Sequence, residues 1–355
     1  MARASFFFAG TEIQPGTRQT VEVPVAKLYT HTPLHIPVEV VHGRREGPVL
    51  LVCAALHGDE INGVEIIRRV LRNASLRHLR GTLIAVPIVN VFGFIQRTRY
   101  LPDRRDLNRC FPGSESGTLG GRIAYLFRTQ IMENVTHIID LHTGAIHRFN
   151  LPQIRAELKN PETALIAEAF GAPIILNASL REGTLREYAD SKGIPVITFE
   201  GGEALRFDDV VISSGVRGVN RVMRALDMLP VKSGRSKPRK RSEVAASSNW
   251  VRADIDGIMR PIARLGQRVR KGQKLAVVAD PFGETETAIT TPFSGIVVGM
   301  NNLPLVNEGE AIYHIARFDE LAEAEKAMDY FRSSIEPEAN GEAVMPVHPW
   351  DEQQK

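Results

Sequence analysis

The chain has 355 residues, more than one average domain needs, and is long enough for a main domain with a smaller one appended. Hydrophobic residues make up 43% of it and charged residues 24%, and no apolar run has the length that crosses a bilayer. This composition excludes a disordered, a collagen-like and a transmembrane protein. The formal net charge of +3 is too small to indicate that the chain as a whole binds nucleic acid.

The cysteines and the N-terminus bear on the cellular compartment. Cys53 and Cys110 are the only cysteines, so no disulfide framework is expected. The apolar stretch at residues 6–10 is much shorter than the core of a signal peptide. Both features predict a cytoplasmic protein in a reducing compartment.

Between residues 49 and 199, short runs rich in Val, Ile and Leu alternate with amphipathic stretches. The predicted strands are Val49–Leu56, Thr82–Val89, Thr136–Leu141, Ala172–Leu176 and Ile194–Phe199. The predicted helices are Gly63–Leu71, Leu119–Asn134, Pro161–Phe170, Leu185–Lys192 and Val216–Leu229. This alternation is typical of an α/β fold with a mixed, mostly parallel sheet flanked by helices. The region Val21–Val41 is expected to add one or two edge strands.

The composition changes after residue 230, where the main domain, residues 1–230, is predicted to end. Residues 231–249 lack apolar periodicity, and six of the eleven residues from 231 to 241 are Lys or Arg, which predicts a basic flexible linker. Residues 250–318 contain short strand-like runs separated by Gly and Pro, which predicts a small, separately folded all-β domain. A helix over Asp319–Tyr330 and a polar tail are expected within residues 319–355.

The predicted β domain resembles the biotinyl/lipoyl type of barrel-sandwich. The resemblance rests on Ala253–Ile258, Leu265–Gln273 and Thr291–Val297. Domains of that type carry a modifiable Lys at a hairpin tip, whereas the corresponding stretch here, Gly283–Thr287, contains no Lys. We therefore expect a covering or assembly role and no swinging arm.

Two predicted strands end in residues that bind metals. The first runs into His57-Gly58-Asp59-Glu60, and the strand Thr136–Leu141 is followed by His142. The carboxyl ends of strands in an α/β sheet face the crevice in which ligands bind. Two His and one Glu match the ligand set of a catalytic zinc site, in which the fourth position stays open for water. Asp140 either orients an imidazole or caps a loop, and the pattern favours neither reading.

A third predicted strand ends in Glu200. A carboxylate at the end of an apolar strand is costly to bury without a charge partner, and a zinc ion would be such a partner. Beside it, a glutamate can take a proton from water and deliver it to a leaving amine. The alternative is an exposed turn residue.

The long basic loop Gln96–Arg109 separates the first two ligand segments. Such a charge run is usually solvated, yet Asn108 and Arg109 together suit a substrate carboxylate. A guanidinium binds a carboxylate in a bidentate manner, and the amide adds a donor.

These residues together resemble the succinylglutamate desuccinylase/aspartoacylase family, which is itself similar to the zinc carboxypeptidases. The matching segments are His57-Gly58-Asp59-Glu60, Asp106-Leu107-Asn108-Arg109 with Phe111-Pro112-Gly113, Asp140-Leu141-His142 and Phe199-Glu200. The resemblance covers about residues 45–225. It implies one Zn²⁺ per chain, bound by His57, Glu60 and His142. It further implies that Glu200 is the catalytic base and acid, that Arg99 polarises the scissile carbonyl, and that Asn108 and Arg109 bind the substrate carboxylate.

The resemblance implies a zinc-dependent hydrolase that cleaves the amide bond of an N-acyl amino acid or a similar small carboxylate by metal-activated water. Two alternatives stay open: a zinc carboxypeptidase acting on the C-terminal residue of a peptide, and a non-catalytic binding module. The basic linker lacks the interleaved aromatic residues that stack on bases, which argues against a nucleic-acid partner. No membrane partner is expected, and a homo-oligomer is left open.

Overall fold

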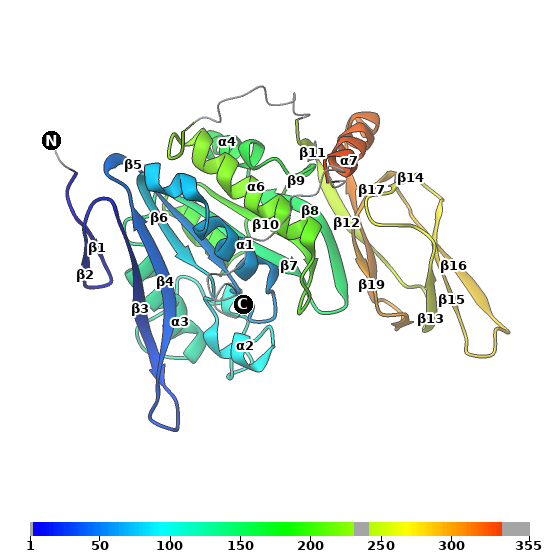
Figure 1. Ribbon diagram of the computed structural model, residues 1–355. Coiled ribbons are helices and arrows are strands. Elements are labelled where there is room, and N and C mark those ends of the chain that lie inside the picture. Colours follow the sequence, from blue (N-terminus) through cyan, green and yellow to red (C-terminus); the bar gives the residue numbers. More distant parts are fainter. Residues whose placement is uncertain (1–2, 231–240, 336–355) are drawn as a thin grey trace, which may run out of the picture.

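The computed structural model describes residues 3–230 and 241–335, so the basic stretch 231–240 and the tail 336–355 lie outside the described residues. The strands form a 13-stranded mixed sheet, a 4-stranded sheet and a 2-stranded hairpin (Figure 1). Among the described residues, no helix has both the length and the apolar character needed to cross a membrane.

The N-terminal part is an α/β structure. Its strands are β1 (Phe6–Phe8), β2 (Thr11–Ile13), β3 (Thr17–Lys27), β4 (Pro33–His42), β5 (Arg45–Ala54), β6 (Arg80–Val86), β7 (His137–Gly144), β8 (Arg148–Ala156), β9 (Ile174–Asn177) and β10 (Val196–Glu203). Its α-helices are α1 (Asn62–Leu71), α2 (Val91–Gln96), α3 (Leu119–Leu126), α4 (Pro161–Phe170), α5 (Leu185–Ser191) and α6 (Asp209–Ala225). Short 3₁₀ turns cover Ala74–His78 and Leu107–Arg109, and a π-helical turn, Phe127–Ile131, extends α3.

The large sheet has the order β3-β4-β6-β5-β7-β10-β8-β17-β19-β12. The four central strands β6, β5, β7 and β10 are parallel, so β5, β7 and β10 end at the same edge of the sheet. Antiparallel pairing joins the outer strands of this order, which are β3, β4, β8, β17, β19 and β12. The sheet is therefore mixed, as predicted, and its parallel strands lie in the centre.

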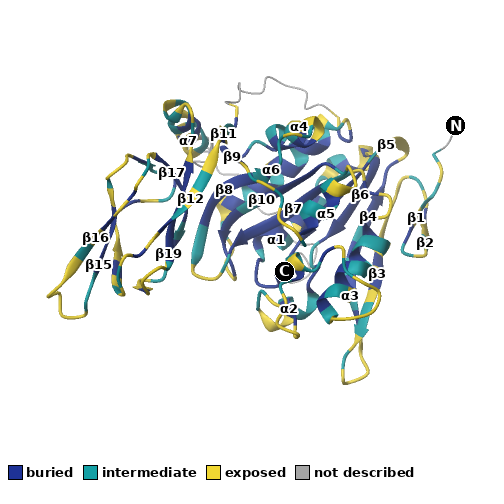
Figure 2. Cartoon of the chain, turned by 180° about the vertical axis from the view of Figure 1, so that it is seen from behind, coloured by how far each residue is buried: buried dark blue, intermediate teal, exposed yellow. Residues whose placement is uncertain are grey.

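Helices cover both faces of the central sheet. Helices α1, α4 and α6 bury one apolar core against it (Figure 1), and α3 and α5 bury another on the opposite face (Figure 2). The buried strands read as continuous apolar runs because both of their faces are covered.

The C-terminal part continues the same sheet. Its strands are β11 (Glu243–Ala245), β12 (Ser247–Arg252), β13 (Gly257–Pro261), β14 (Arg268–Val269), β15 (Lys274–Ala279), β16 (Glu286–Thr290), β17 (Gly295–Asn301), β18 (Leu305–Val306) and β19 (Ala311–Arg317), and helix α7 covers Leu321–Ile335. Strand β17 pairs antiparallel with β8, and β11 pairs parallel with β9. The 4-stranded sheet β16-β15-β13-β18 packs on β12, β17 and β19 through a shared apolar core.

The structure differs from the sequence predictions in four places. The antiparallel strand β8 and the short helix α2 were not predicted, and α6 begins seven residues before the predicted Val216. Within the predicted linker 231–249, residues 243–245 and 247–249 belong to strands β11 and β12. These short strands have no apolar periodicity and could not be predicted from it. They are formed by pairing with β9 and β19.

The continuous sheet changes what removal of the C-terminal part should do. A fragment ending at residue 230 would uncover the edges of β8 and β9, together with the apolar side chains of Leu151 and Leu176, which pack against β11, β17 and α7. Exposed strand edges and apolar patches favour aggregation. We expect the fragment to aggregate on size-exclusion chromatography or to melt about 10 °C or more below the full chain. A monomeric fragment with the melting temperature of the full chain would contradict this expectation.

Candidate metal centre and active site

The first ligand segment lies in the turn between β5 and α1. Strand β5 ends at Ala54, and Ala55 adopts a left-handed conformation (φ 50°) that turns the chain before His57. Non-glycine residues rarely adopt this conformation, and it is frequent at functional sites. Glu60 follows in the same turn, two residues before α1 begins.

Close packing of α1 brings this turn to the end of β7. A Cβ atom on Gly63 would lie 2.6 Å from the Cβ of Ala54 and 2.8 Å from the Cβ of Leu141, so only glycine allows the helix to approach β5 and β7 this closely. His142 directly follows Leu141 on β7, and its imidazole contacts the carboxylate of Glu60.

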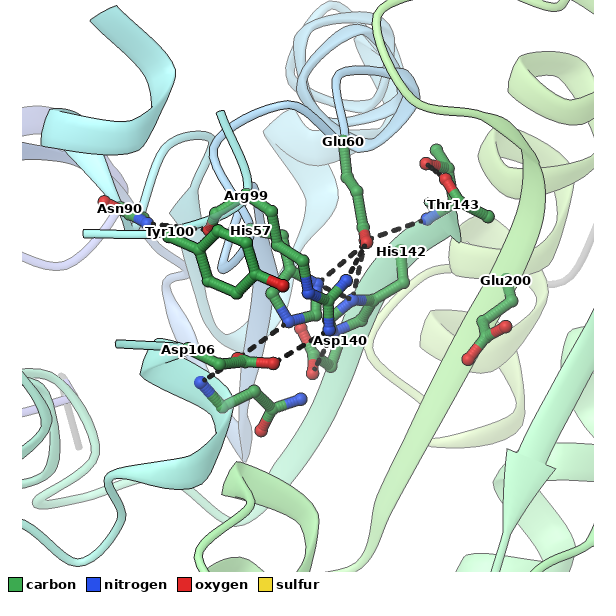
Figure 3. A network of polar contacts seen from close by, with 12 residues as sticks. His57, Glu60, Asn90, Arg99, Tyr100, Asp106, Asp140, His142, Thr143 and Glu200 are labelled. Atoms are coloured by element: carbon green, nitrogen blue, oxygen red, sulfur yellow. Dashed lines mark hydrogen bonds and ion pairs between the residues drawn. The ribbon is translucent and has the colours of Figure 1, made fainter. Parts of the chain in front are cut away.

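His57, Glu60 and His142 form one buried cluster (Figure 3). The Nδ1 atom of His57 lies 2.8 Å from Oε1 of Glu60, and Nδ1 of His142 lies 2.8 Å from Oε2. The two Nδ1 atoms are 3.2 Å apart, and one ligand atom from each residue lies within 4.8 Å of the others. Two imidazole nitrogens and a carboxylate form a donor set that suits a divalent metal such as zinc.

An aspartate contacts the outer nitrogen of each imidazole. Nε2 of His142 lies 2.7 Å from Oδ2 of Asp140, which confirms the reading of Asp140 as an orienting partner. Nε2 of His57 lies 3.1 Å from Oδ1 of Asp106, a role that the sequence analysis did not assign. Such contacts fix the ring orientation and direct both Nδ1 atoms into the cluster. Asp106 also accepts a hydrogen bond from the backbone N–H of Asn108, so the carboxylate caps the short 3₁₀ turn.

The cluster carries a surplus of negative charge. The carboxylates of Glu60, Asp106 and Asp140 face one guanidinium, that of Arg99, and leave two negative charges when both imidazoles are neutral. Burial alone would lower the pKa of His142, but Asp140 and Glu60 raise it well above its usual range. Burial alone would also lower the pKa of His57, but Glu60 and Asp106 raise it above its usual value. The surplus matches the charge of a divalent cation.

Arg99 lies at the cluster with its guanidinium shared between two carboxylates. It donates to Oε1 of Glu60 at 3.1 Å and to Oδ2 of Asp106 at 2.9 Å. Burial alone would raise the pKa of the Asp106 carboxyl. The contacts with His57 and Arg99 outweigh burial and hold that pKa far below its usual range. The structure therefore brings Arg99 next to the three predicted ligands.

Glu200 lies beside the cluster, and no contact joins it to the labelled residues of the cluster (Figure 3). It stands on β10 at the register position of His142 on β7. Its Oε1 is 2.8 Å from Nε of Arg155, and its Oε2 accepts a hydrogen bond of 2.7 Å from Asn150. The carboxylate is thus neither a solvated turn residue nor in contact with the ligand set, and its charge partner in the structure is an arginine.

A cavity of about 170 Å³ connects Glu200 with the cluster, and His57 and His142 are among its lining residues. Its lining also includes the predicted substrate-binding pair. The side-chain oxygen of Asn108 accepts a hydrogen bond of 2.9 Å from the backbone N–H of Leu185. The NH₂ group of Asn108 is therefore the part of the side chain that can donate to a substrate. Arg109, the other residue of the pair, also lines this cavity and is exposed.

Most of the positive charge in this cavity was not predicted from the sequence. Five arginines line it, namely Arg99, Arg109, Arg155, Arg181 and Arg186. Glu200 is the one carboxylate among the described lining residues. Burial, and next the guanidinium of Arg155, lower the pKa of Arg186, which donates to the backbone oxygens of Ala178 and Ser179. Arg155 could have been identified only if β8 had been predicted, because its position follows from the pairing of β8 with β10.

Comparisons with known proteins agree with this geometry. The sequence profile of the succinylglutamate desuccinylase/aspartoacylase catalytic domain matches residues 46–226, and the chain belongs to this family. The N-alpha-acetyl-L-2,4-diaminobutyric acid deacetylase of Halomonas elongata is 26% identical over 294 residues, covering 79% of this chain and 85% of that protein. Both names describe enzymes that remove acyl groups.

Solved structures show the same fold. A succinylglutamate desuccinylase/aspartoacylase from Rhodobacter sphaeroides superposes with a TM-score of 0.76 at 24% identity, covering 85% of this chain and 95% of that chain. The product-bound ectoine utilization protein EutE (DoeB) from Ruegeria pomeroyi also gives 0.76, at 22% identity and with 89% and 96% covered. The matches cover 85% and 89% of this chain, so they extend beyond residues 1–230.

The ligand assignment makes a direct prediction. His142→Ala removes one of three protein ligands and should weaken metal binding by more than the roughly 10–100-fold that loss of an outer hydrogen-bond partner costs. His137→Ala, at the other end of β7, is the matched control and should keep its metal. Metal content after desalting, measured by elemental analysis, checks both variants. Full metal content in His142→Ala would show that the ligands are misassigned.

Proposed function

We propose that the protein is a zinc-dependent deacylase that hydrolyses the linear amide bond of a small N-acyl amino acid. The observation that carries the proposal is the cluster of His57, Glu60 and His142, whose two histidines line one cavity with Glu200 and five arginines. An amide hydrolase has to polarise the substrate carbonyl, deprotonate a water molecule and bind the rest of the substrate. The metal cluster, Glu200 and the arginines would supply these functions in that order. Membership of the family supports the same reading.

His57, Glu60 and His142 would hold the zinc ion through two nitrogens and one oxygen. Zinc supplies Lewis acidity and makes water nucleophilic near neutral pH. Asp106 and Asp140 keep both imidazoles turned toward the ion. The fit rests on the donor set and on the surplus negative charge around it.

Glu200 would act as the general base and then as the general acid. Its carboxylate accepts a proton from the attacking water as the new C–O bond forms. The same proton passes to the amine nitrogen when the C–N bond breaks, so the products are a carboxylic acid and an amine. Arg99, beside Glu60, would stabilise the negative charge that develops on the carbonyl oxygen.

The arginines indicate an acidic substrate. Arg99 and Arg155 are paired with carboxylates, whereas no carboxylate of the described residues forms an ion pair with Arg109, Arg181 or Arg186. We propose that Asn108 and Arg109 bind the carboxylate of the amino acid. The remaining positive charge favours a substrate with a second anionic group over the diamino acid derivative that the Halomonas relative is named for.

The role of Glu200 can be tested by an isosteric change. Glu200→Gln should keep its metal content and melting temperature and lose on the order of 10²–10⁴-fold in kcat, because an amide cannot carry the proton. The assay uses N-acetyl and N-succinyl amino acids together with a short peptide. Release of a C-terminal residue from the peptide, with the N-acyl amino acids left intact, would identify a carboxypeptidase. A loss of only a few-fold in a fully metal-loaded variant would contradict the role of Glu200.

The substrate carboxylate is tested with Arg109. Arg109→Ala removes a charge-assisted hydrogen bond worth about 1.5–3 kcal/mol, so kcat/KM should fall by about 10- to 100-fold. Arg109→Lys should recover only part of this loss, because an ammonium lacks the planar fork. Arg105→Ala, an exposed arginine of the same loop, is the control and should have little effect. If an amidated substrate reacts as well as the free carboxylate in the wild type, no such contact exists.

A further inference from the structure

The carboxylate of Glu200 is held on both oxygens by side chains of one neighbouring strand. Arg155 lies 2.8 Å from Oε1, and the NH₂ group of Asn150 donates to Oε2 at 2.7 Å. Both residues belong to β8, which pairs antiparallel with β10. The register of this pair shifts between Glu200 and Gly202, and such irregularities redirect side chains next to functional sites.

Asn150 is enclosed on its other side by the C-terminal part of the chain. Gly299 of β17 is its register partner, and a Cβ atom on Gly299 would lie 2.8 Å from Oδ1 of Asn150. The same Cβ atom would lie 3.3 Å from the Cβ of His314 on β19. Only glycine therefore leaves room for the Asn150 amide between β17 and Glu200.

The neighbours of Gly299 have little freedom to move away. His314 is buried and stacks on Trp250 with ring centroids 4.8 Å apart and an angle of 8° between the planes. Asn150 is only 6% exposed. A side chain at position 299 would therefore displace the Asn150 amide, which donates a hydrogen bond to the Glu200 carboxylate, before it displaced the packed ring or the backbone.

A second contact holds the hairpin that carries Asn150. In the turn between β7 and β8, the backbone oxygen of His147 accepts a hydrogen bond of 2.7 Å from the backbone N–H of Asn302. The carboxylate of Glu203 accepts bonds of 3.0 Å from the His147 backbone N–H and from the Asn302 side chain. The segment after β17 thus fixes the same hairpin three residues before Asn150.

We propose that the C-terminal sheet sets the position of the Glu200 carboxylate through Asn150, with Gly299 keeping the space that the Asn150 amide requires. Asn150 and Gly299 are then positioning residues for the proposed base, and the inference rests on the proposed function of Glu200. The strands after the basic stretch would control turnover although they contribute no metal ligand.

The hydrogen bond itself is tested at Asn150. Asn150→Ala should lower kcat by about 10- to 100-fold, the range for losing a hydrogen bond to a charged group, with KM and metal content nearly unchanged. Asn150→Asp keeps the shape of the side chain but offers no NH₂ donor, so it should lose at least as much. Wild-type kcat in Asn150→Asp would overturn the proposal, because a role in packing alone requires only the shape.

The link to the C-terminal sheet is tested by a double-mutant cycle. Gly299→Ala should lower kcat about as much as Asn150→Ala, and the double variant should be no slower than Asn150→Ala alone, because both changes break one interaction. Val297→Ala, which opens the core of the same strand away from Asn150, is the control. It should lower the melting temperature and keep wild-type kcat. Fully additive losses would overturn the proposal, and if Gly299→Ala does not fold, the Asn150 variants decide.

Glu200→Gln separates this inference from the proposed function. If Glu200→Gln retains turnover, the role of Glu200 as base fails, and the positioning inference fails with it. If Glu200→Gln is inactive while Asn150→Ala and Asn150→Asp keep wild-type kcat, the positioning inference fails alone.

Discussion

The buried carboxylate of Glu60 determines how the rest of the site is arranged. Glu60 is only 2% exposed, and a carboxylate so far removed from water is costly unless charged partners surround it. Its partners are the imidazoles of His57 and His142, the guanidinium of Arg99 and the backbone N–H of Thr143. They come from the turn after β5, the end of β7 and the basic loop. Their convergence on one carboxylate explains why three distant segments meet at one point of the sheet edge.

The two sides of the cavity depend on different parts of the chain. The ligand side is built by β5, β7 and α1, which lie in the central parallel sheet. The side that carries Glu200 is formed by β10 and β8, and β8 is paired with β17 of the C-terminal part. Leu151 and Ala245 share one apolar core with Ile296 and helix α7, so this pairing is also a packing contact. The C-terminal strands therefore belong to the framework of the cavity.

The proximity of the candidate ligands could be predicted from the sequence, because their segments follow apolar runs long enough to indicate buried strands. His57 and His142 both fit this rule, and parallel strands bring such positions to one edge. The other side could not be predicted, because β8 carries the buried polar residues Asn150 and Gln153 and the half-buried Arg155, and its sequence does not show the pattern of a strand. The burial of these polar residues depends on partners in β10 and β17, which are about 50 to 150 residues away and which local patterns cannot indicate.

The most direct test of this account is an anomalous difference map from crystals grown with zinc, measured on both sides of the zinc absorption edge. The account predicts one peak per chain within bonding distance of Nδ1 of His57, a carboxylate oxygen of Glu60 and Nδ1 of His142, at roughly 2.0–2.2 Å from each. A cavity without a zinc peak in zinc-saturated crystals, or a peak bound by other residues, would contradict it.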